Sequence, residues 1–165
     1  MPAPPPAPAP DDGFIHYTAP YDFMIQSNGL SAIGPPWSQL TAIDLNTGTI
    51  KWQVPDGTVP SIDQTNGATG NFFTRGGVLV TAGGLVFVAT STDRKLRAYD
   101  EDTGKVVWET TLPAAAEGVP SSYEVGGREY IALCVAGGNG LMAKGPIAPQ
   151  AAAPGQYMVF ALPKK

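Results

Sequence analysis

Two aspartates, Asp44 and Asp100, recur at the same place in two similar stretches of the sequence. A pair of carboxylates could in principle act as a general acid and a general base. Each aspartate, however, comes shortly before a Thr-Gly pair, and this order of residues is typical of a turn between two strands. The sequence therefore favours a turn role for both carboxylates over a catalytic one.

A second set of side chains carries oxygen atoms that could bind a hard cation. Asp63, Asn66 and Asn71 lie within one polar, glycine-rich stretch. Their spacing does not match a defined calcium-binding loop, in which ligands alternate along the chain and end in a bidentate glutamate. We therefore predict no metal ligand in this chain.

Nucleophilic catalysis has little support in the sequence. Cys134 is the only cysteine and His16 the only histidine, and they lie far apart in the chain, so no Cys–His pair is predicted. Cys134 sits in the apolar run 131–136, which predicts a buried strand residue, and His16 is expected on a surface loop. The Gly-Asn-Gly stretch at 138–140 is not followed by a helical pattern, so it does not indicate a nucleotide site.

The composition bounds the kind of protein. The chain has 165 residues, 43% of them apolar and 15% charged, with 20 glycines, 17 prolines and a net charge of −4. Mild acidity without a basic stripe gives no basis for nucleic-acid binding. The sequence contains no stretch of about 18 apolar residues, so it predicts no transmembrane span. The glycines and prolines indicate many turns between short strands.

An eleven-residue unit occurs twice in the sequence, at 42–52 and 98–108, and indicates the strands and turns that position these residues. The two copies share alanine, aspartate, threonine, glycine and tryptophan, and Trp52 and Trp108 are 56 residues apart. Each copy predicts a strand, a Thr-Gly turn and a second strand. We expect the tryptophan of one unit to pack on a neighbouring unit, because a large apolar ring is stabilised when it is buried against other residues.

The strands around these units form a regular pattern. Two strands are predicted at 38–44 and 49–53, four at 78–81, 85–91, 95–100 and 105–109, and three at 120–124, 130–135 and 156–162. Four short strands joined by tight turns are the size of one propeller blade. We therefore predict an all-β fold of antiparallel four-stranded β-propeller blades. Residues 1–12 read as a Pro/Ala-rich tail or linker, and residues 13–163 as a partial propeller.

Two features of the first half carry open alternatives. The long polar loop at 55–75 is expected to be functional or to face a partner, because structureless loops of this length are uncommon in compact domains. Trp37, which follows two prolines, is expected to pack locally, with a wall near a substrate or cofactor as the alternative.

The two units resemble the tryptophan-docking motifs of pyrroloquinoline-quinone (PQQ) dehydrogenases, and the nearest branch is similar to the membrane-associated glucose dehydrogenases. The likeness extends from about Tyr21 to Pro163. The other stretches that carry it are 34–37, 40–48, 76–87, 96–100, 129–132, 136–138 and 159–163. The resemblance implies an eight-bladed propeller, of which this chain matches about the last two and a half blades.

The resemblance also implies a chemistry and a location. Family members hold PQQ and calcium or a similar divalent ion, and oxidise a sugar or alcohol by hydride transfer to the quinone while a carboxylate takes the proton. They are periplasmic. No match to the catalytic aspartate or the metal ligands exists in this chain. The cofactor-contact candidates that the resemblance implies are Thr74, Arg75, Gly76 and Gly77, although Arg75 also fits a solvated loop charge.

The docking-motif residues that the resemblance implies are Ala42, Thr47, Gly48, Trp52, Ala98, Thr103, Gly104 and Trp108. Two hypotheses follow. The chain is a segment of a PQQ-dependent dehydrogenase that is inactive without the missing blades, or it is a non-catalytic propeller-repeat scaffold or interaction module. In either case we expect it to pair with the remaining blades or to self-associate, because it would leave open strand edges.

Overall fold

The computed structural model describes residues 13–15, 24, 26–27, 30–72, 76–136 and 154–162. All regular structure in these residues is β-strand, which confirms the predicted all-β fold. In the same residues, no helix is long and apolar enough to cross a membrane.

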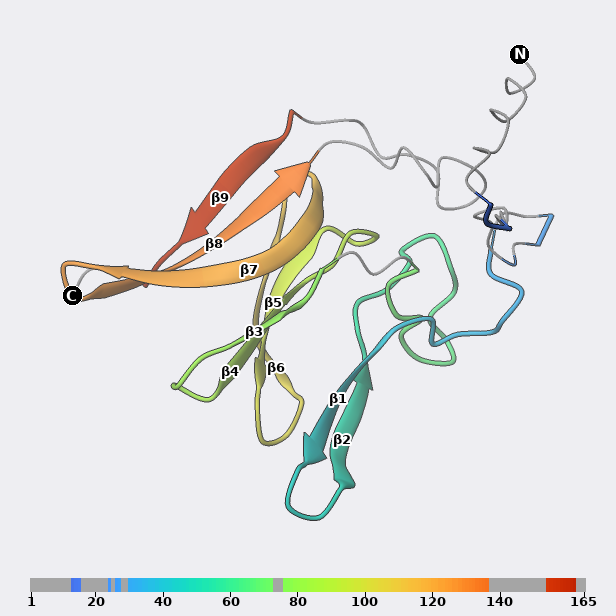
Figure 1. Cartoon of the computed structure of the whole chain (residues 1–165), viewed down its shortest axis with the longest axis horizontal. Helices are drawn as coiled ribbons and strands as arrows, with labels where there is room; N and C mark the ends of the chain where they lie inside the picture. Colours follow the sequence, from blue (N-terminus) through green and yellow to red (C-terminus); the bar gives the residue numbers. More distant parts are fainter. Residues whose placement is uncertain are drawn as a thin grey trace.

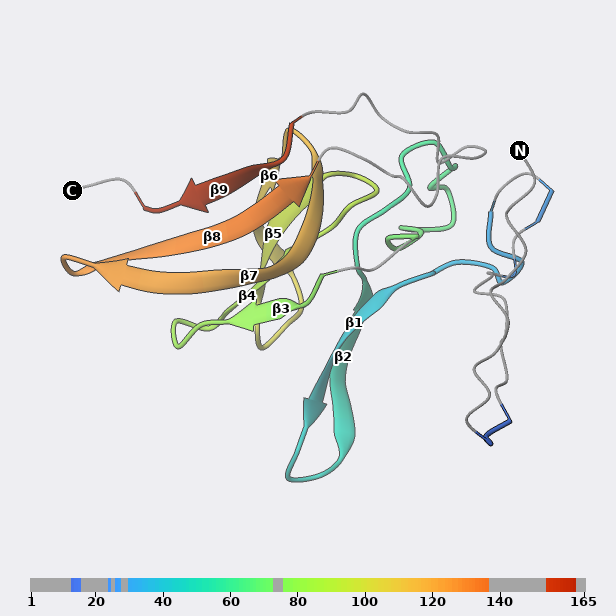
Figure 2. The ribbon, with the colours of Figure 1, turned by 45° about the horizontal axis from the view of Figure 1, so that its top comes forward.

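The strands form three antiparallel sheets of two, four and three strands, which lie side by side in the order of the sequence (Figures 1 and 2). The hairpin sheet contains β1 (Gln39–Asp44) and β2 (Thr49–Pro55). The middle sheet contains β3 (Val78–Val80), β4 (Leu85–Ala89), β5 (Lys95–Asp100) and β6 (Val106–Thr111) in that order. The third sheet contains β7 (Ala115–Val125), β8 (Arg128–Ala136) and β9 (Gln156–Phe160).

The two copies of the repeated unit have the same backbone geometry. Ala42 lies opposite Trp52 in the hairpin sheet, and Ala98 lies opposite Trp108 in the middle sheet. In both copies the register shifts immediately after the alanine, which indicates a bulge at the same place. The recurrence in sequence therefore reflects a recurrence of one strand–turn–strand structure.

Both aspartates of the repeated unit serve the turn, as predicted. Asp44 Oδ1 accepts a hydrogen bond of 2.8 Å from the backbone N–H of Asn46, and Asp100 Oδ1 accepts one of 2.8 Å from that of Thr103. The Thr103 hydroxyl donates to the same oxygen of Asp100. These hydrogen bonds stabilise the carboxylate and lower the pKa of Asp100.

The core lies mainly between the middle and third sheets. Its buried members are Ala89, Leu96, Leu112, Ala114, Ala116, Leu133 and Val135, with Phe87, Met158 and Phe160 packed against them. A second cluster joins the hairpin sheet to the middle sheet, where Leu40 and Val54 pack against Val86, Val88 and Tyr99. Contact between sheets therefore stabilises the fold, as expected for stacked repeats.

Strand β7 is longer than predicted. It begins at Ala115, five residues before the expected start at Pro120. Its pairing with β8 shifts between Glu117 and Ser121, and Gly118 has a φ of 89°. A bulge here lets the strand continue through Pro120, which cannot donate a hydrogen bond to a regular ladder.

The part of the loop after β2 that the structure describes, residues 56–72, has several buried residues. Val59, Thr69 and Asn71 are at most 2% exposed. The loop folds back on the chain before β1, where the Trp37 N–H donates to the Thr69 carbonyl at 2.8 Å. The Trp37 ring is also held locally, because its Nε1 donates to the Ile33 carbonyl at 2.7 Å.

Cys134 lies in β8 as predicted, but it is only half-buried. The apolar run that contains it has two faces, and only Ile131, Leu133 and Val135 face the core. Cys134 is paired with Tyr157 on the opposite, outward face, where Tyr157 is largely exposed. A continuous apolar strand suggests burial on both faces, whereas here one face has no sheet against it among the described residues.

Candidate functional site

The first tryptophan of the repeated unit joins the hairpin sheet to the middle sheet. Trp52 Nε1 donates to the backbone carbonyl of Glu101 at 2.9 Å. Its six-membered ring lies directly over Gly104, where an added Cβ would come within 2.6 Å of Trp52 Cε3. An exposed ion pair of 3.1 Å between Lys51 and Asp102 lies beside this contact. The structure thus brings Trp52 of one copy onto the Thr-Gly turn of the other.

The second tryptophan faces the third sheet in a different way. Trp108 makes an edge-to-face contact with Phe160, with ring centroids 5.9 Å apart, and remains 42% exposed. Among the described residues, its Nε1 has no hydrogen-bond acceptor. The described part of the third sheet ends at its third strand, β9, so it offers no strand corresponding to β6. Trp108 therefore lacks the surroundings that Trp52 has.

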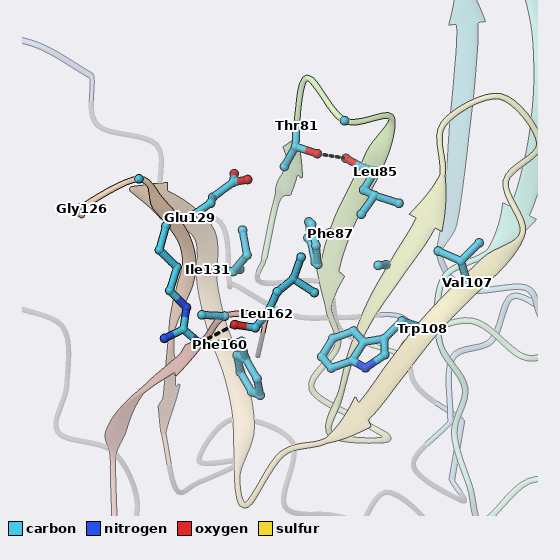
Figure 3. Close-up of a pocket in the computed structure, with 15 residues that line it drawn as sticks. Thr81, Leu85, Phe87, Val107, Trp108, Gly126, Glu129, Ile131, Phe160 and Leu162 are labelled. Carbon is cyan, nitrogen blue, oxygen red and sulfur yellow. Dashed lines mark hydrogen bonds between the residues drawn. The ribbon is translucent and has the colours of Figure 1, made fainter. Parts of the chain in front are cut away.

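A pocket of about 890 Å³ opens at this incomplete contact. Figure 3 shows Trp108 and Phe87 on the wall formed by the middle sheet and Phe160, Ile131 and Leu162 on the facing wall. Arg128 also lines it, and although its Nη2 donates to the Leu162 carbonyl, its buried Nε has no partner among the described residues. The pocket is thus lined mainly by apolar groups, with the unpartnered, buried Nε of Arg128 beside it.

The first strands of the middle and third sheets converge at the predicted glycine pair. Gly76 forms a parallel bridge with Gly118, and a Cβ on Gly76 would lie 3.1 Å from the Gly118 carbonyl and 3.2 Å from that of Ala89. A Cβ on Gly77 would lie 2.8 Å from a methyl group of Val119. The close packing of the two sheets therefore leaves little room for a side chain at either glycine. Thr74 and Arg75, the other two cofactor-contact candidates, lie outside the described residues, as do His16 and residues 138–140.

The oxygen-bearing side chains of the loop do not converge on one point. Asp63 Oδ1 accepts from the backbone N–H of Thr65 at 2.9 Å, while Asn71 Oδ1 accepts from the backbone N–H of Thr92 at 3.0 Å. Across the described part of the chain, no group of three or more His, Cys, Asp or Glu side chains could hold a metal ion.

A buried polar cluster on the middle sheet was not anticipated from the sequence. Arg97 pairs with Asp93, donates to the Thr90 hydroxyl at 3.0 Å, and lies 3.3 Å from a carboxylate oxygen of Glu109. The side chains of Arg97 and Asp93 are only 9% and 2% exposed. A guanidinium in the apolar strand 96–99 was the available sequence signal, because such a charge must find a partner when it is buried.

Asp56 and Tyr99 adjoin this cluster from opposite sides of a sheet-to-sheet contact. Burial is the main cause that raises the pKa of Asp56 to about 6, partly offset by the positive charge of Arg97. Burial likewise raises the pKa of Tyr99 to about 12. Both residues are at most 5% exposed, so this side of the cluster is shielded from solvent, whereas Glu109 on the other side is 43% exposed.

Comparison with known proteins decides the family. The profile of the PQQ glucose/ethanol/alcohol dehydrogenase β-propeller domain matches residues 7–131. The chain belongs to the PQQ-dependent dehydrogenase family. The resemblance seen in the sequence is thereby confirmed, and the three sheets are propeller blades of this quinoprotein family.

Relatives in the quinoprotein family include the glycerol dehydrogenase large subunit of Gluconobacter oxydans, which is 39% identical over 147 residues, covering 86% of this chain and 19% of the relative. The quinoprotein glucose dehydrogenase of Escherichia coli is 33% identical over 117 residues, covering 68% of this chain and 15% of the relative. This chain therefore spans less than a fifth of the length of these relatives.

Two solved structures have the same fold. The quinohemoprotein alcohol dehydrogenase from Comamonas testosteroni is similar with a TM-score of 0.55 and 30% identity, over 74% of this chain and 16% of that one. A europium-containing methanol dehydrogenase is similar with a TM-score of 0.54 and 22% identity, over 75% of this chain and 23% of that one. The latter likeness concerns the fold alone.

The described residues do not by themselves fit the cofactor of the quinoprotein family. The described atoms next to the place that a Cβ would take at Gly76 and Gly77 are backbone carbonyls and the side-chain carbons of Val119, which offer no positive charge to the carboxylates of a quinone. Nor do the described residues gather ligands for a metal ion. We therefore derive no catalytic step through PQQ from the described residues.

Proposed function

We propose that this chain supplies propeller blades to a PQQ-dependent dehydrogenase that oxidises a sugar or alcohol, and that it is inactive without the remaining blades. The observation that carries the proposal is the difference between the two tryptophans. Trp52 packs on Gly104 of the next sheet and donates a hydrogen bond to Glu101. Trp108 instead lines a pocket, and no described strand lies beyond β9. PQQ, calcium or a similar ion, and the catalytic base would be held mainly by residues outside this chain.

The structural role proposed for the repeated units is tryptophan docking between blades. It is supported by the contact of Trp52 with Gly104 and by the identical register of both copies. The small alanines opposite the rings leave space for them, and the Thr-Gly turns present backbone to the neighbouring ring. On this proposal Trp108 docks in the same way on a segment that completes the third sheet.

The partner proposed for the third sheet is the remainder of the propeller. Its outward face exposes four large side chains, Tyr123, Val125, Tyr157 and Val159, at 43–83%. A neighbouring blade would cover this face, and a strand added beside β9 would cover the open edge of the sheet. Backbone carbonyls of the added segment could accept from Trp108 Nε1 and Arg128 Nε. Without that partner, self-association through the open edges is expected.

A chimera tests the proposed activity. In it, this chain replaces the segment that it matches in the Gluconobacter oxydans glycerol dehydrogenase large subunit. We expect PQQ with calcium to quench tryptophan fluorescence saturably and polyol-dependent dye reduction to appear in the chimera, with neither signal from the chain alone. Turnover by the isolated chain would contradict its proposed inactivity. A folded chimera that binds no PQQ would instead favour the scaffold role.

Cys134 provides a direct test of the proposed partner. Its half-buried thiol lies on the outward face of the third sheet, so a soluble disulfide reagent should label it in the isolated chain. In the folded chimera we expect labelling to slow at least tenfold, because a neighbouring blade covers that face. A thiol that reacts equally fast in both proteins would argue against the covering blade. Cys134→Ser supplies the unlabelled control.

The scaffold role remains a second candidate because the glycine pair is explained by packing alone. Gly76 and Gly77 fit tightly against the third sheet whether or not a quinone binds nearby. For the enzyme role, we further propose a place in the glucose-dehydrogenase-like branch and a periplasmic location, both of which rest on family membership. The chimera distinguishes the two roles through PQQ binding.

A further inference from the structure

Asp56 is a buried carboxyl group at the contact between the loop after β2 and the middle sheet. The residue is 5% exposed, and its Oδ1 has no hydrogen-bond partner among the described residues. The next residue, Gly57, lies so close to Thr90 of the middle sheet that an added Cβ would come within 2.9 Å of its methyl group. The carboxyl is thus buried beside a close contact between the loop and the middle sheet, and one of its oxygens is left unsatisfied.

The backbone of Asp56 ties this side chain to the loop. Its N–H donates to the Ser38 carbonyl at 3.1 Å, and its own carbonyl accepts from the Ser38 hydroxyl at 3.0 Å and from the N–H of Asn71. Asn71 in turn accepts a hydrogen bond of 3.0 Å from the N–H of Thr92, in the turn between β4 and β5 of the middle sheet. The backbone of Asp56 is therefore hydrogen-bonded both to Ser38, just before β1, and to Asn71, near the end of the described part of the loop.

Among the described residues, Arg97 is the cation whose charge acts on Asp56, and its donors are already engaged. Within the described residues, Arg97 directs its Nη1 to Thr90, its Nη2 to Asp93 and its Nε to Glu109. Its charge attracts Asp56 from a distance, whereas the charge of Asp93 repels it. From β5, a hydrogen bond with Tyr99 also favours the ionised form of Asp56.

The balance of these influences favours the protonated carboxyl. Burial, the largest influence, raises the pKa of Asp56 from 3.8 to about 6 against the opposing effect of Arg97. Because this pKa is higher in the folded chain than in the unfolded one, protonation of Asp56 stabilises the folded chain. This contribution to the free energy of unfolding is fully present below about pH 4. It decreases as the pH rises and is lost above about pH 6.

We propose that Asp56 is a pH-sensitive latch, which holds the loop at 56–72 on the middle sheet when its carboxyl is protonated and loosens it when the carboxyl is ionised. The ionised form leaves a charged, buried oxygen without a donor, and opening of the loop would let water reach it. This inference does not depend on the proposed dehydrogenase function, because it concerns only contacts within the chain.

Two measurements on the full chain test the latch. In a carbon-13 titration of aspartate carboxyls, one resonance should have a midpoint near pH 6, and Asp56→Asn should remove it. Hydrogen exchange of the loop amides, corrected for the intrinsic rate, should show the open population rising between pH 4.5 and 7.5. The ceiling is about a hundredfold, which corresponds to the shift of about two pKa units. In Asp56→Asn the open population should not change with pH.

Matched variants keep the test decisive. Asp63 lies in the same loop but is exposed and bonded to Thr65, so Asp63→Asn should retain the pH dependence. Should Asp56→Asn not fold, Tyr99→Phe provides the second route, because loss of its hydroxyl should move the midpoint upward. A midpoint of Asp56 below pH 4.5, or equal pH dependence in the wild-type chain and Asp56→Asn, would overturn the proposal.

Discussion

Gly104→Ala is expected to lower the free energy of unfolding by about 2–4 kcal/mol, through strain at its backbone and loss of the seat of Trp52. Gly104 has a φ of 69°, and a Cβ there would come within 2.6 Å of the Trp52 ring. The ring would have to leave its position, which would also break its hydrogen bond to the Glu101 carbonyl. Urea denaturation followed by tryptophan fluorescence measures the loss.

Gly48→Ala is the matched control for this change. Gly48 occupies the same position of the first copy, with a φ of 70°, but no described atom lies within 4 Å of the place that an added Cβ would take. The backbone strain is therefore the same, on the order of 1 kcal/mol, while the contact with a tryptophan is absent. The difference between the two variants isolates the docking contact. Equal losses of stability would show that Trp52 contributes nothing at Gly104.

Arg97→Met is expected to destabilise the chain by about 3–5 kcal/mol, because it leaves the buried carboxylate of Asp93 without its cation. The Asp93 side chain is 2% exposed, so water cannot take the place of the guanidinium. The Thr90 hydroxyl would also lose its donor from Arg97. The midpoint of urea denaturation at constant pH provides the measurement.

Two further variants test the cause of that loss. Lys51→Met removes the cation of the exposed pair with Asp102 and should cost less than about 1 kcal/mol. The double variant Arg97→Met/Asp93→Asn should recover part of the stability lost in Arg97→Met, because the unpaired charge is removed as well. A double variant less stable than Arg97→Met would mean that the unpaired charge of Asp93 is not the cause of the loss.

The regular strands were the most predictable part of this molecule. The alternation of apolar residues and the Thr-Gly turns are local patterns, so β5 was predicted with its observed bounds, Lys95–Asp100. The start of β7 was missed because a proline in a regular strand is usually its first residue, which placed the predicted start at Pro120. The bulge at Gly118 that lets the strand begin earlier depends on pairing with β8. The polar composition of the loop at 56–72 does not reveal that Asn71 is buried and hydrogen-bonded to Thr92.

The candidate site was likewise predictable from the sequence only in part. The family, the two docking-motif copies and the turn role of Asp44 and Asp100 were accessible from the sequence, since residue types at fixed spacing carry them. The sequence could not distinguish the seated Trp52 from the open Trp108, because both copies have the same motif.

The sequence by itself determined the strand pattern and the family, because hydrophobic alternation and turn chemistry act between residues that are close along the chain. Only the tertiary structure decided which groups are buried and paired. It brought Asp56 to a charge cluster formed by residues that follow it by about forty positions, and it placed Gly76 against Gly118. Burial and close approach arise from contacts between sheets, and those contacts exist only after the chain has folded.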